Sequence, residues 1–125
     1  MINTIEVLQN YKNLKITRKQ LRNILGKNFT NAKLEEGDEV VVDNNDLIFV
    51  LQATKEGRIS VPDLVDWVNV IWFSGLYDYS EKYSASMASV MAELEELDEY
   101  DYTLPPEQID QYIAVLEKNE EYIER

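Results

Sequence analysis

The chain has 125 residues, a length that suits one domain, and 24 acidic against 12 basic residues give it a formal net charge of −12. Its 45% hydrophobic content argues against intrinsic disorder. It has no cysteine and no histidine, which excludes disulfides, thiolate zinc sites and cysteine nucleophiles and removes the usual general base near neutral pH. We therefore expect one acidic domain spanning residues 1–125.

Charge is sorted along the sequence. Residues 1–34 have a net charge of +6, residues 35–54 of −6, residues 55–92 of −2 and residues 93–125 of −10. A field this uneven steers association with a basic partner and repels nucleic acid and anionic membranes. We therefore expect a basic protein partner, and we expect neither nucleic acid nor a membrane to be bound.

The sequence shows no targeting signal and no membrane span. Residues 1–13 lack a basic segment followed by an apolar run. The longest apolar stretch, residues 68–76, is interrupted by polar residues and is far too short to cross a bilayer. We expect a cytoplasmic protein, and the absence of cysteine is compatible with that compartment.

Two short helices are predicted in the basic N-terminal third. Asn3 or Thr4 can cap a helix that runs to about Asn13. Thr17 can cap a second helix, and Gly26 is placed to end it. The three basic residues of the second helix fall on its outer face, which suits either solvent or an anionic partner surface. They are Arg18, Lys19 and Arg22.

The segment before Gly57 permits two structures. The β-branched run of residues 39–43 predicts a short strand. The apolar residues that follow, 46–53, form either a helix or the second strand of a hairpin. We favour the helix, capped by Asn45 or Asp46, because the apolar run is continuous rather than alternating.

The next two predicted helices have clear ends. Ser60 caps the first, which is closed by Gly75 and is apolar over most of its surface. A helix of this kind should lie in the middle of the core. Ser80 opens the second, whose apolar residues repeat at helical spacing to about Asp98.

The last predicted helix begins at Pro105-Pro106 and runs to Leu116 or on to Ile123. Proline and glycine are scarce in the chain, at three and four residues, which suits helices better than a many-turned β fold. The predicted fold class is therefore all-α. We expect a single-domain bundle of five or six short helices, with a small β-hairpin near residues 39–51 as the alternative.

Acidic residues crowd the stretch from Glu93 to Asp101, but their pattern does not predict catalysis. General acid–base chemistry needs two carboxylates in different environments, whereas these acids are all expected to face water. The spacing of an EF-hand is missing, and a di-iron bundle site would need histidine. Phosphate-binding loops and nucleophile elbows are absent as well. We expect no catalytic residue, no metal site and no cofactor.

Tyrosine stands beside acidic residues at two places. Tyrosine buries a large area and keeps a polar tip, so its combination with acid suits a partner surface rich in Arg and Lys. Tyr77, Tyr79 and Tyr83 form one group, in which Tyr77 and Tyr83 also fit a place in the core. The other group surrounds the break before the last helix and is the predicted partner-binding site. Its residues are Glu95, Glu96, Asp98, Glu99, Tyr100, Asp101 and Tyr102.

The order of elements over residues 47–116 is similar to that of a known family. The matching features are an apolar helix, Glu-Gly-Arg-Ile-Ser at 56–60, a helix with Asp66-Trp67, the acidic helix end 93–97, Thr-Leu-Pro at 103–105 and a final helix with Ile109, Ile113 and Leu116. This layout resembles small bacterial toxin-immunity proteins of the colicin D immunity-like kind. The resemblance implies an acidic helical protein that binds a cognate toxin domain and blocks its basic nuclease surface.

The leading functional hypothesis is a non-enzymatic immunity or antitoxin-like inhibitor, whose acids act as phosphate mimics facing Lys and Arg of a toxin domain. The alternative is a structural or assembly module, phage-encoded or self-associating. In that case Trp67, Trp72 and Phe73 are expected to be partly exposed in the seam of a homodimer.

Overall fold

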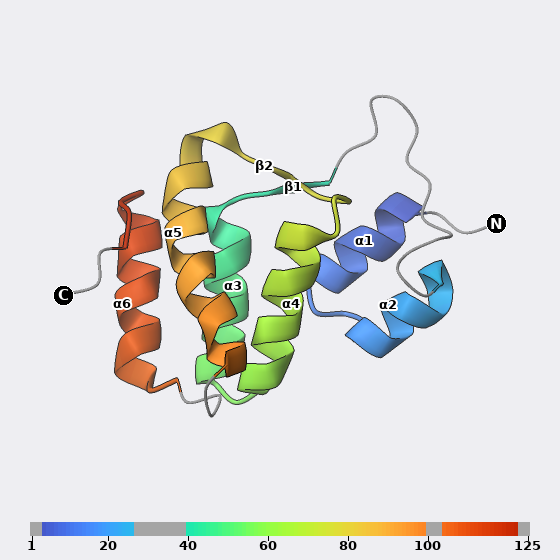
Figure 1. The fold of residues 1–125 in the computed structure, drawn as a ribbon, viewed down its shortest axis with the longest axis horizontal. Helices are drawn as coiled ribbons and strands as arrows, with labels where there is room; N and C mark the ends of the chain where they lie inside the picture. The colour runs from blue at the N-terminus through green and yellow to red at the C-terminus, as the bar shows by residue number, and fades with distance from the viewer. Residues whose placement is uncertain (1–3, 27–39, 100–103, 123–125) are drawn as a thin grey trace.

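The computed structural model describes residues 4–26, 40–99 and 104–122 (Figure 1). These residues form a mostly helical structure with one very small sheet, so the predicted all-α class is confirmed. In chain order the elements are α1 (Thr4–Lys12), α2 (Arg18–Leu25), β1 (Val41–Val42), α3 (Asn44–Lys55), α4 (Val61–Phe73), β2 (Asp78–Tyr79), η2 (Glu81–Tyr83), α5 (Ser84–Glu95), η3 (Glu96–Glu99) and α6 (Pro106–Glu117).

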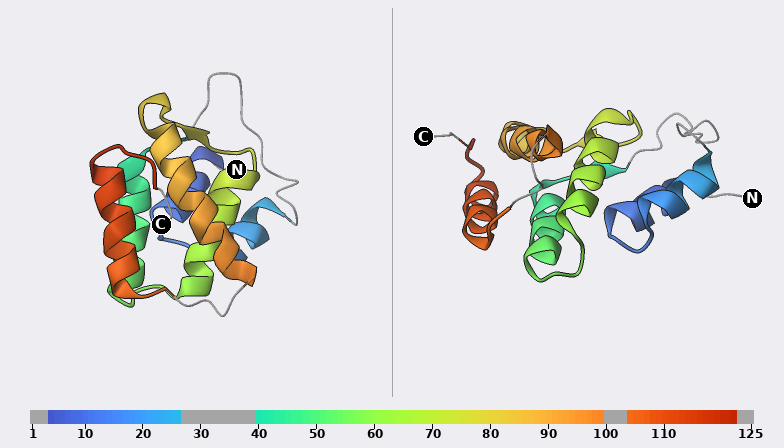
Figure 2. Two further views of the ribbon diagram at one scale, coloured as in Figure 1. Left: turned by 60° about the vertical axis from the view of Figure 1, so that its left-hand side comes forward. Right: turned by 60° about the horizontal axis from the view of Figure 1, so that its bottom comes forward.

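Four helices, α3 to α6, lie side by side and form the bundle, while α1 and α2 pack on each other at the opposite end (Figures 1 and 2). Helix α3 packs mainly on α6, and α4 packs mainly on α5. Helix α4 lies between the other bundle helices and the α1–α2 pair, which confirms the central place predicted for it. Its buried residues are Leu64, Val65, Trp67, Val68, Val70 and Ile71.

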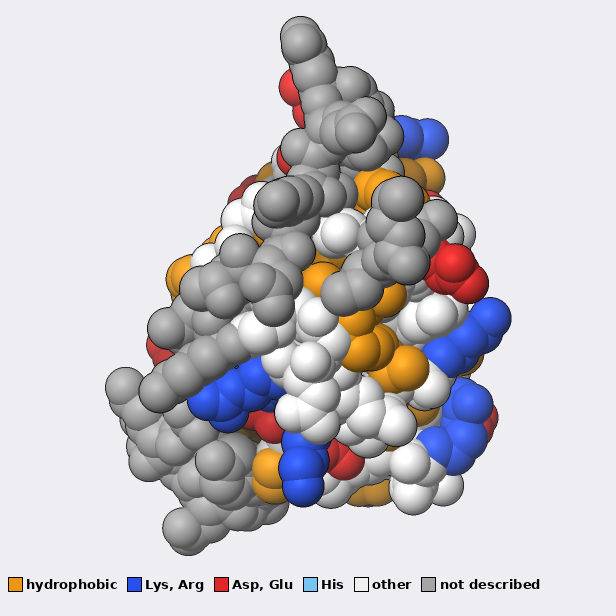
Figure 3. All heavy atoms as spheres, turned by 90° about the vertical axis from the view of Figure 1, so that its right-hand side faces the viewer, with side chains coloured by type: hydrophobic (Ala, Val, Ile, Leu, Met, Phe, Trp, Pro, Cys, Tyr) orange, Lys and Arg blue, Asp and Glu red, His pale blue; other side chains and the backbone are white. Residues whose placement is uncertain are grey.

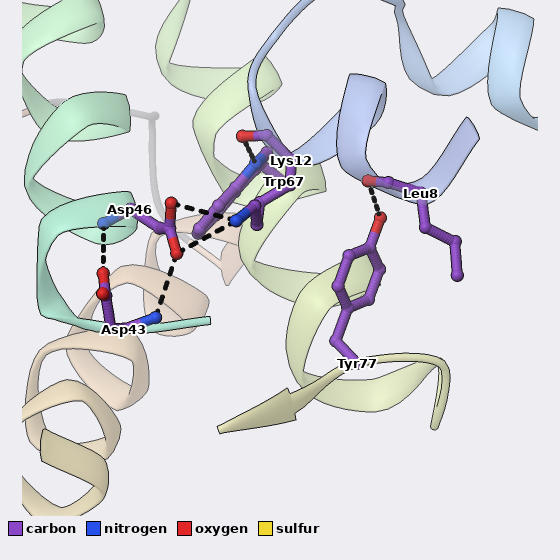
Figure 4. Close-up of polar contacts among 6 residues, drawn as sticks. All are labelled: Leu8, Lys12, Asp43, Asp46, Trp67 and Tyr77. Carbon is purple, nitrogen blue, oxygen red and sulfur yellow. Dashed lines mark hydrogen bonds and ion pairs between the residues drawn. The ribbon is translucent and has the colours of Figure 1, made fainter. Parts of the chain in front are cut away.

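Reciprocal capping boxes start α2, α3 and α4. The predicted caps Thr17 and Ser60 are confirmed. The predicted cap of α3, at Asn45 or Asp46, is wrong because the helix begins earlier, after Asp43. The Asp43 carboxylate accepts the Asp46 N–H at 3.1 Å, and the Asp46 carboxylate accepts the Asp43 N–H at 3.0 Å (Figure 4). Each aspartate thus satisfies a backbone donor that the helix leaves unpaired.

The hairpin alternative is also wrong. Strand β1 pairs in parallel with β2, with Val41 opposite Asp78 and Val42 opposite Tyr79. Parallel strands need a crossover, which α3 and α4 supply, whereas a hairpin partner would have to follow β1 directly. Within the predicted strand, residues 41–42 are extended, and Glu39 lies outside the described residues.

The last two predicted helices differ from the observed ones, the first in its continuity and the second in its length. The segment from Ser80 to Asp98 is helical in three consecutive pieces, η2, α5 and η3, rather than in one helix. Helix α6 ends at Glu117 and does not continue toward Ile123, because Asn119 takes the left-handed conformation with φ 54°. The Asn119 and Glu120 N–H groups then donate to carbonyls of the last turn, a common way to close a helix.

Buried and partly buried polar contacts attach α1 to the bundle (Figure 4). The Tyr77 hydroxyl donates to the Leu8 carbonyl at 2.7 Å. The Trp67 indole N–H donates to the Lys12 carbonyl at 3.1 Å. The Lys12 ammonium pairs with the Asp46 carboxylate at 3.3 Å. Lys12 therefore joins α1 to α4 through its backbone and to α3 through its side chain. No helix within the described ranges is both long and apolar enough to cross a membrane.

Candidate functional site

Acidic and basic side chains collect at opposite ends of the molecule. Together α5, η3 and α6 carry eight acidic residues and no basic residue. The α1–α2 pair carries four basic residues and one acidic residue. Figure 3 faces the α1–α2 end, where Lys and Arg side chains stand around exposed hydrophobic atoms with a few acids beside them. Among the described residues, the acids of α5, η3 and α6 are thus separated from the bases of α1 and α2.

The acids of α5 lie where a helix disfavours them. Helices α1, α2 and α3 each have a basic residue in the last turn, Lys12, Arg22 and Lys55, which complements the negative end of the helix dipole. Helix α5 has no base there and instead ends with Glu93 and Glu95, followed by the acids of η3. Negative charge at this end costs about 0.3–1 kcal/mol for each well-placed residue. Helices α4 and α6, which pack on α5, also lack a base in the last turn, so helix C-termini without a compensating positive charge are common to this side of the bundle.

The structure describes part of the predicted partner-binding site. Glu95 is half-buried at the end of α5, and Glu96 is exposed at the start of η3. Asp98 and Glu99 continue η3. The remaining three predicted residues, Tyr100, Asp101 and Tyr102, lie outside the described residues. The η3 segment packs on both α5 and α4, so the bundle holds the backbone that carries its acidic residues.

The other tyrosine group serves the fold. Tyr77 is buried and donates to Leu8, and the Tyr79 hydroxyl donates to the Ile71 carbonyl at 2.8 Å. Burial raises the pKa of both phenols, to about 12 for Tyr79. Tyr83 is half-buried, with the Lys82 ammonium 5.3 Å from its ring centre. For Tyr77, the place in the core is therefore the correct alternative.

Two ion pairs between described residues join separate helices of the fold. Lys55 on α3 binds Asp110 on α6 at 2.7 Å. Arg18 on α2 binds Asp66 on α4 at 2.8 Å. Glu96 and Glu107 are exposed on either side of the α5–α6 connection. Around the predicted site, acidic side chains thus remain available to a partner.

Sequence reasoning missed a cleft of about 150 Å³ between the α1–α2 connection and the first half of α4. Its walls combine apolar and charged side chains from segments that are far apart in the sequence. They are Tyr11, Leu14, Lys15, Ile16, Thr17, Arg18, Gln20, Ile59, Asp63, Asp66 and Trp67. The sequence carries no local signal for such a cleft, because only the packing of α2 beside α4 creates it.

The predicted homodimer seam is partly wrong. Trp67 is only 1% exposed because it packs inside the core and its indole N–H is bonded to Lys12. Trp72 is half-buried and stacks on Phe73, with ring centres 5.2 Å apart. Phe73 is 60% exposed. An apolar contact at this place would therefore centre on Phe73.

Among the described residues, no group of three or more Asp or Glu side chains is arranged to hold a metal ion. Comparisons of the chain with protein-family models, with curated proteins and with solved structures found no match.

Proposed function

We propose that this chain is a non-enzymatic protein-binding module, most concretely a bacterial immunity or antitoxin-like inhibitor that acts in the cytoplasm and covers a basic, nuclease-type surface of a partner toxin. One observation supports this most directly. The last turn of α5 and the η3 segment that follows it carry five acidic residues and no basic residue, although negative charge is generally unfavourable at a helix C-terminus. Proteins keep locally unfavourable choices mainly at functional sites.

The binding mode follows from the chemistry of these acids. Carboxylates at a helical end can occupy the positions that nucleic-acid phosphates take on a basic surface, where Arg and Lys bind them through charge-assisted hydrogen bonds. Tyr100 and Tyr102 are the proposed apolar anchors beside them. Charge complementarity of this kind accelerates association and makes it sensitive to salt.

Genetic context and co-expression provide the test. A neighbouring gene should encode a large secreted protein with a basic C-terminal domain, and co-expression of the present chain should suppress the toxicity of that domain. The double variant Glu95→Gln/Glu96→Gln should slow association with the domain at least about tenfold at low salt, an effect that shrinks as salt is added.

The matched control is Asp78→Asn/Glu81→Gln, which also removes two negative charges but does so near the other end of α5, where both residues are exposed. Its association rate should stay within about twofold of the original, because the lost charges lie far from the proposed contact. Equal effects of the two double variants would show that net charge alone drives binding and would contradict the proposed site.

Exposed Phe73, stacked on Trp72, supports self-association as a second candidate function. Light scattering at micromolar concentration separates the candidates. A dimer that Phe73→Ser converts to a monomer would support assembly, whereas a monomer in both cases would leave the inhibitor as the function to pursue.

A further inference from the structure

The chain reverses direction after α6 (Figure 2). Helix α6 ends at Glu117, and Asn119 takes the left-handed conformation with φ 54°. The Glu120 N–H donates to the Val115 carbonyl at 3.0 Å, which directs the residues that follow back along the bundle. We call residues 118–122 the strap. Hinges of moving segments are commonly a few residues at the end of a helix, which is where this turn lies.

Tyr122 connects the strap to both α5 and α6. Its backbone N–H donates to the Ser89 hydroxyl at 2.8 Å. Its phenol oxygen accepts the Gln108 side-chain N–H at 3.2 Å, and its ring lies edge-on to Tyr112 with ring centres 5.0 Å apart. Ser89 is in the middle of α5, whereas Gln108 is in the first turn of α6. Tyr122 therefore links the start of α6 to the side of α5.

The contacts of the strap are of the kind that open locally. Residues 118–121 are all exposed, and Tyr122 is half-buried. The two hydrogen bonds of Tyr122 are partly buried, and the bond from the Asn119 side-chain N–H to the Lys82 carbonyl, at 3.0 Å, is exposed. Segments with few buried apolar groups and exposed hydrogen bonds open at a lower free energy than the core. We therefore expect the strap to detach while the bundle stays folded.

The turn that the strap contacts is the uncapped start of a helix. Helices α2, α3 and α4 begin with reciprocal capping boxes, whereas the N-cap residue of α6, Pro105, makes no side-chain capping bond. The Gln108 and Ile109 N–H groups both donate to the Pro105 carbonyl, at 3.0 and 3.2 Å. Helix ends fray, and a missing cap removes one restraint on fraying. Release of the strap should therefore loosen this turn.

We propose that the strap is a conformational switch. In the closed form Tyr122 holds the first turn of α6 against α5, and in the open form this turn frays while the rest of the bundle keeps its structure. Glu107, in the same turn, is one of the exposed acids beside the proposed partner-binding surface. The strap would thus control whether that surface is presented in one fixed arrangement. This consequence rests on the proposed function, whereas the switch itself does not.

Hydrogen exchange of the full chain, measured by NMR at several low urea concentrations, tests the switch. The Tyr122 amide should exchange at a rate independent of urea, through local opening, while the core amides of α4 require global unfolding. Tyr122→Ala removes a hydrogen bond and an aromatic contact, so it should accelerate exchange of the Gln108 and Ile109 amides at least about tenfold. The Cα chemical shifts of residues 106–109 should move toward random-coil values, and those of α1 and α4 should stay unchanged.

Tyr79→Phe is the matched control for Tyr122→Phe, because both tyrosines are half-buried and each variant loses one hydroxyl hydrogen bond. Tyr122→Phe should accelerate exchange of the Ile109 amide about three- to tenfold, the amount that one neutral hydrogen bond contributes. Tyr79→Phe should leave that rate unchanged, since the Tyr79 hydroxyl bonds to α4 rather than to α6.

Three results would overturn the switch: a Tyr122 amide that exchanges only together with the core, an Ile109 amide unaffected by Tyr122→Ala, or equal effects of the two phenylalanine variants on Ile109. None of these measurements needs a partner. Failure of the switch would therefore leave the proposed function untouched, and failure to find a basic partner would leave the switch untouched.

Discussion

At the scale of single residues, two buried tyrosines and a half-buried one, Tyr79, make stability sensitive to alkaline pH. Burial is the main cause that raises the pKa of Tyr11, Tyr77 and Tyr79 above the ordinary value of 10.0, to about 12 for Tyr79. The unfolded chain therefore releases these protons at lower pH than the folded chain. The free energy of unfolding should be unaffected by these groups below about pH 10 and should fall as pH rises through the window from about 10 to 12.

Alkaline titration followed by tyrosine absorbance, together with urea unfolding at each pH, checks this prediction. Part of the phenolate signal of the eight tyrosines should appear late, and the late fraction should shrink in Tyr79→Phe. Simultaneous ionisation of all tyrosines near pH 10 in the folded protein would contradict it.

At the scale of elements, replacing an acid at the end of α5 should stabilise the fold and weaken the binding of a basic partner. Glu96→Lys places a positive charge at the negative end of the helix dipole and should raise the free energy of unfolding by roughly 0.3–1 kcal/mol while it weakens binding of a basic partner. Glu107→Lys makes the same charge change in the first turn of α6, where an acid is favourable, so it should destabilise by a similar amount. Urea unfolding measures the free energy of unfolding of both variants. If both variants were stabilised or both destabilised, the helix dipole would not be the cause of the changes.

The first residue of a helix could be predicted from the sequence where only one good capping residue stands before it. Thr17 and Ser60 are the only capping side chains directly before their helices, so the sequence identifies them. Before α3, the four residues 43–46 are all good caps, and pairing of β1 with the distant β2 decides that Asp43 is used. The cleft was unpredictable for the same reason, because Leu14 and Ile59, which are far apart in the sequence, line the same cleft only in the folded chain. Local sequence patterns do not indicate which distant residues will come into contact.

At the scale of the whole molecule, two described ion pairs join the basic α1–α2 pair to the bundle, Lys12–Asp46 and Arg18–Asp66. The Lys12–Asp46 pair is the less exposed of the two, with side chains 15% and 19% exposed. The other described ion pairs are more exposed and are therefore worth less. The N-terminal pair of helices thus depends on Lys12 more than on any of its other basic residues.

Replacing Lys12 by methionine tests this dependence, because methionine keeps most of the apolar stem and removes the charge. Lys12→Met leaves the half-buried Asp46 carboxylate without its cation and should lower the free energy of unfolding by about 1–2 kcal/mol in urea. Hydrogen exchange should rise mainly in α1 and α2, since Lys12 holds them to α3. Lys19→Met removes the same charge from an exposed position on α2 and should change stability by less than about 0.5 kcal/mol. Equal losses in the two variants, or faster exchange spread over α3 to α6, would show that the N-terminal helices are held by apolar packing alone.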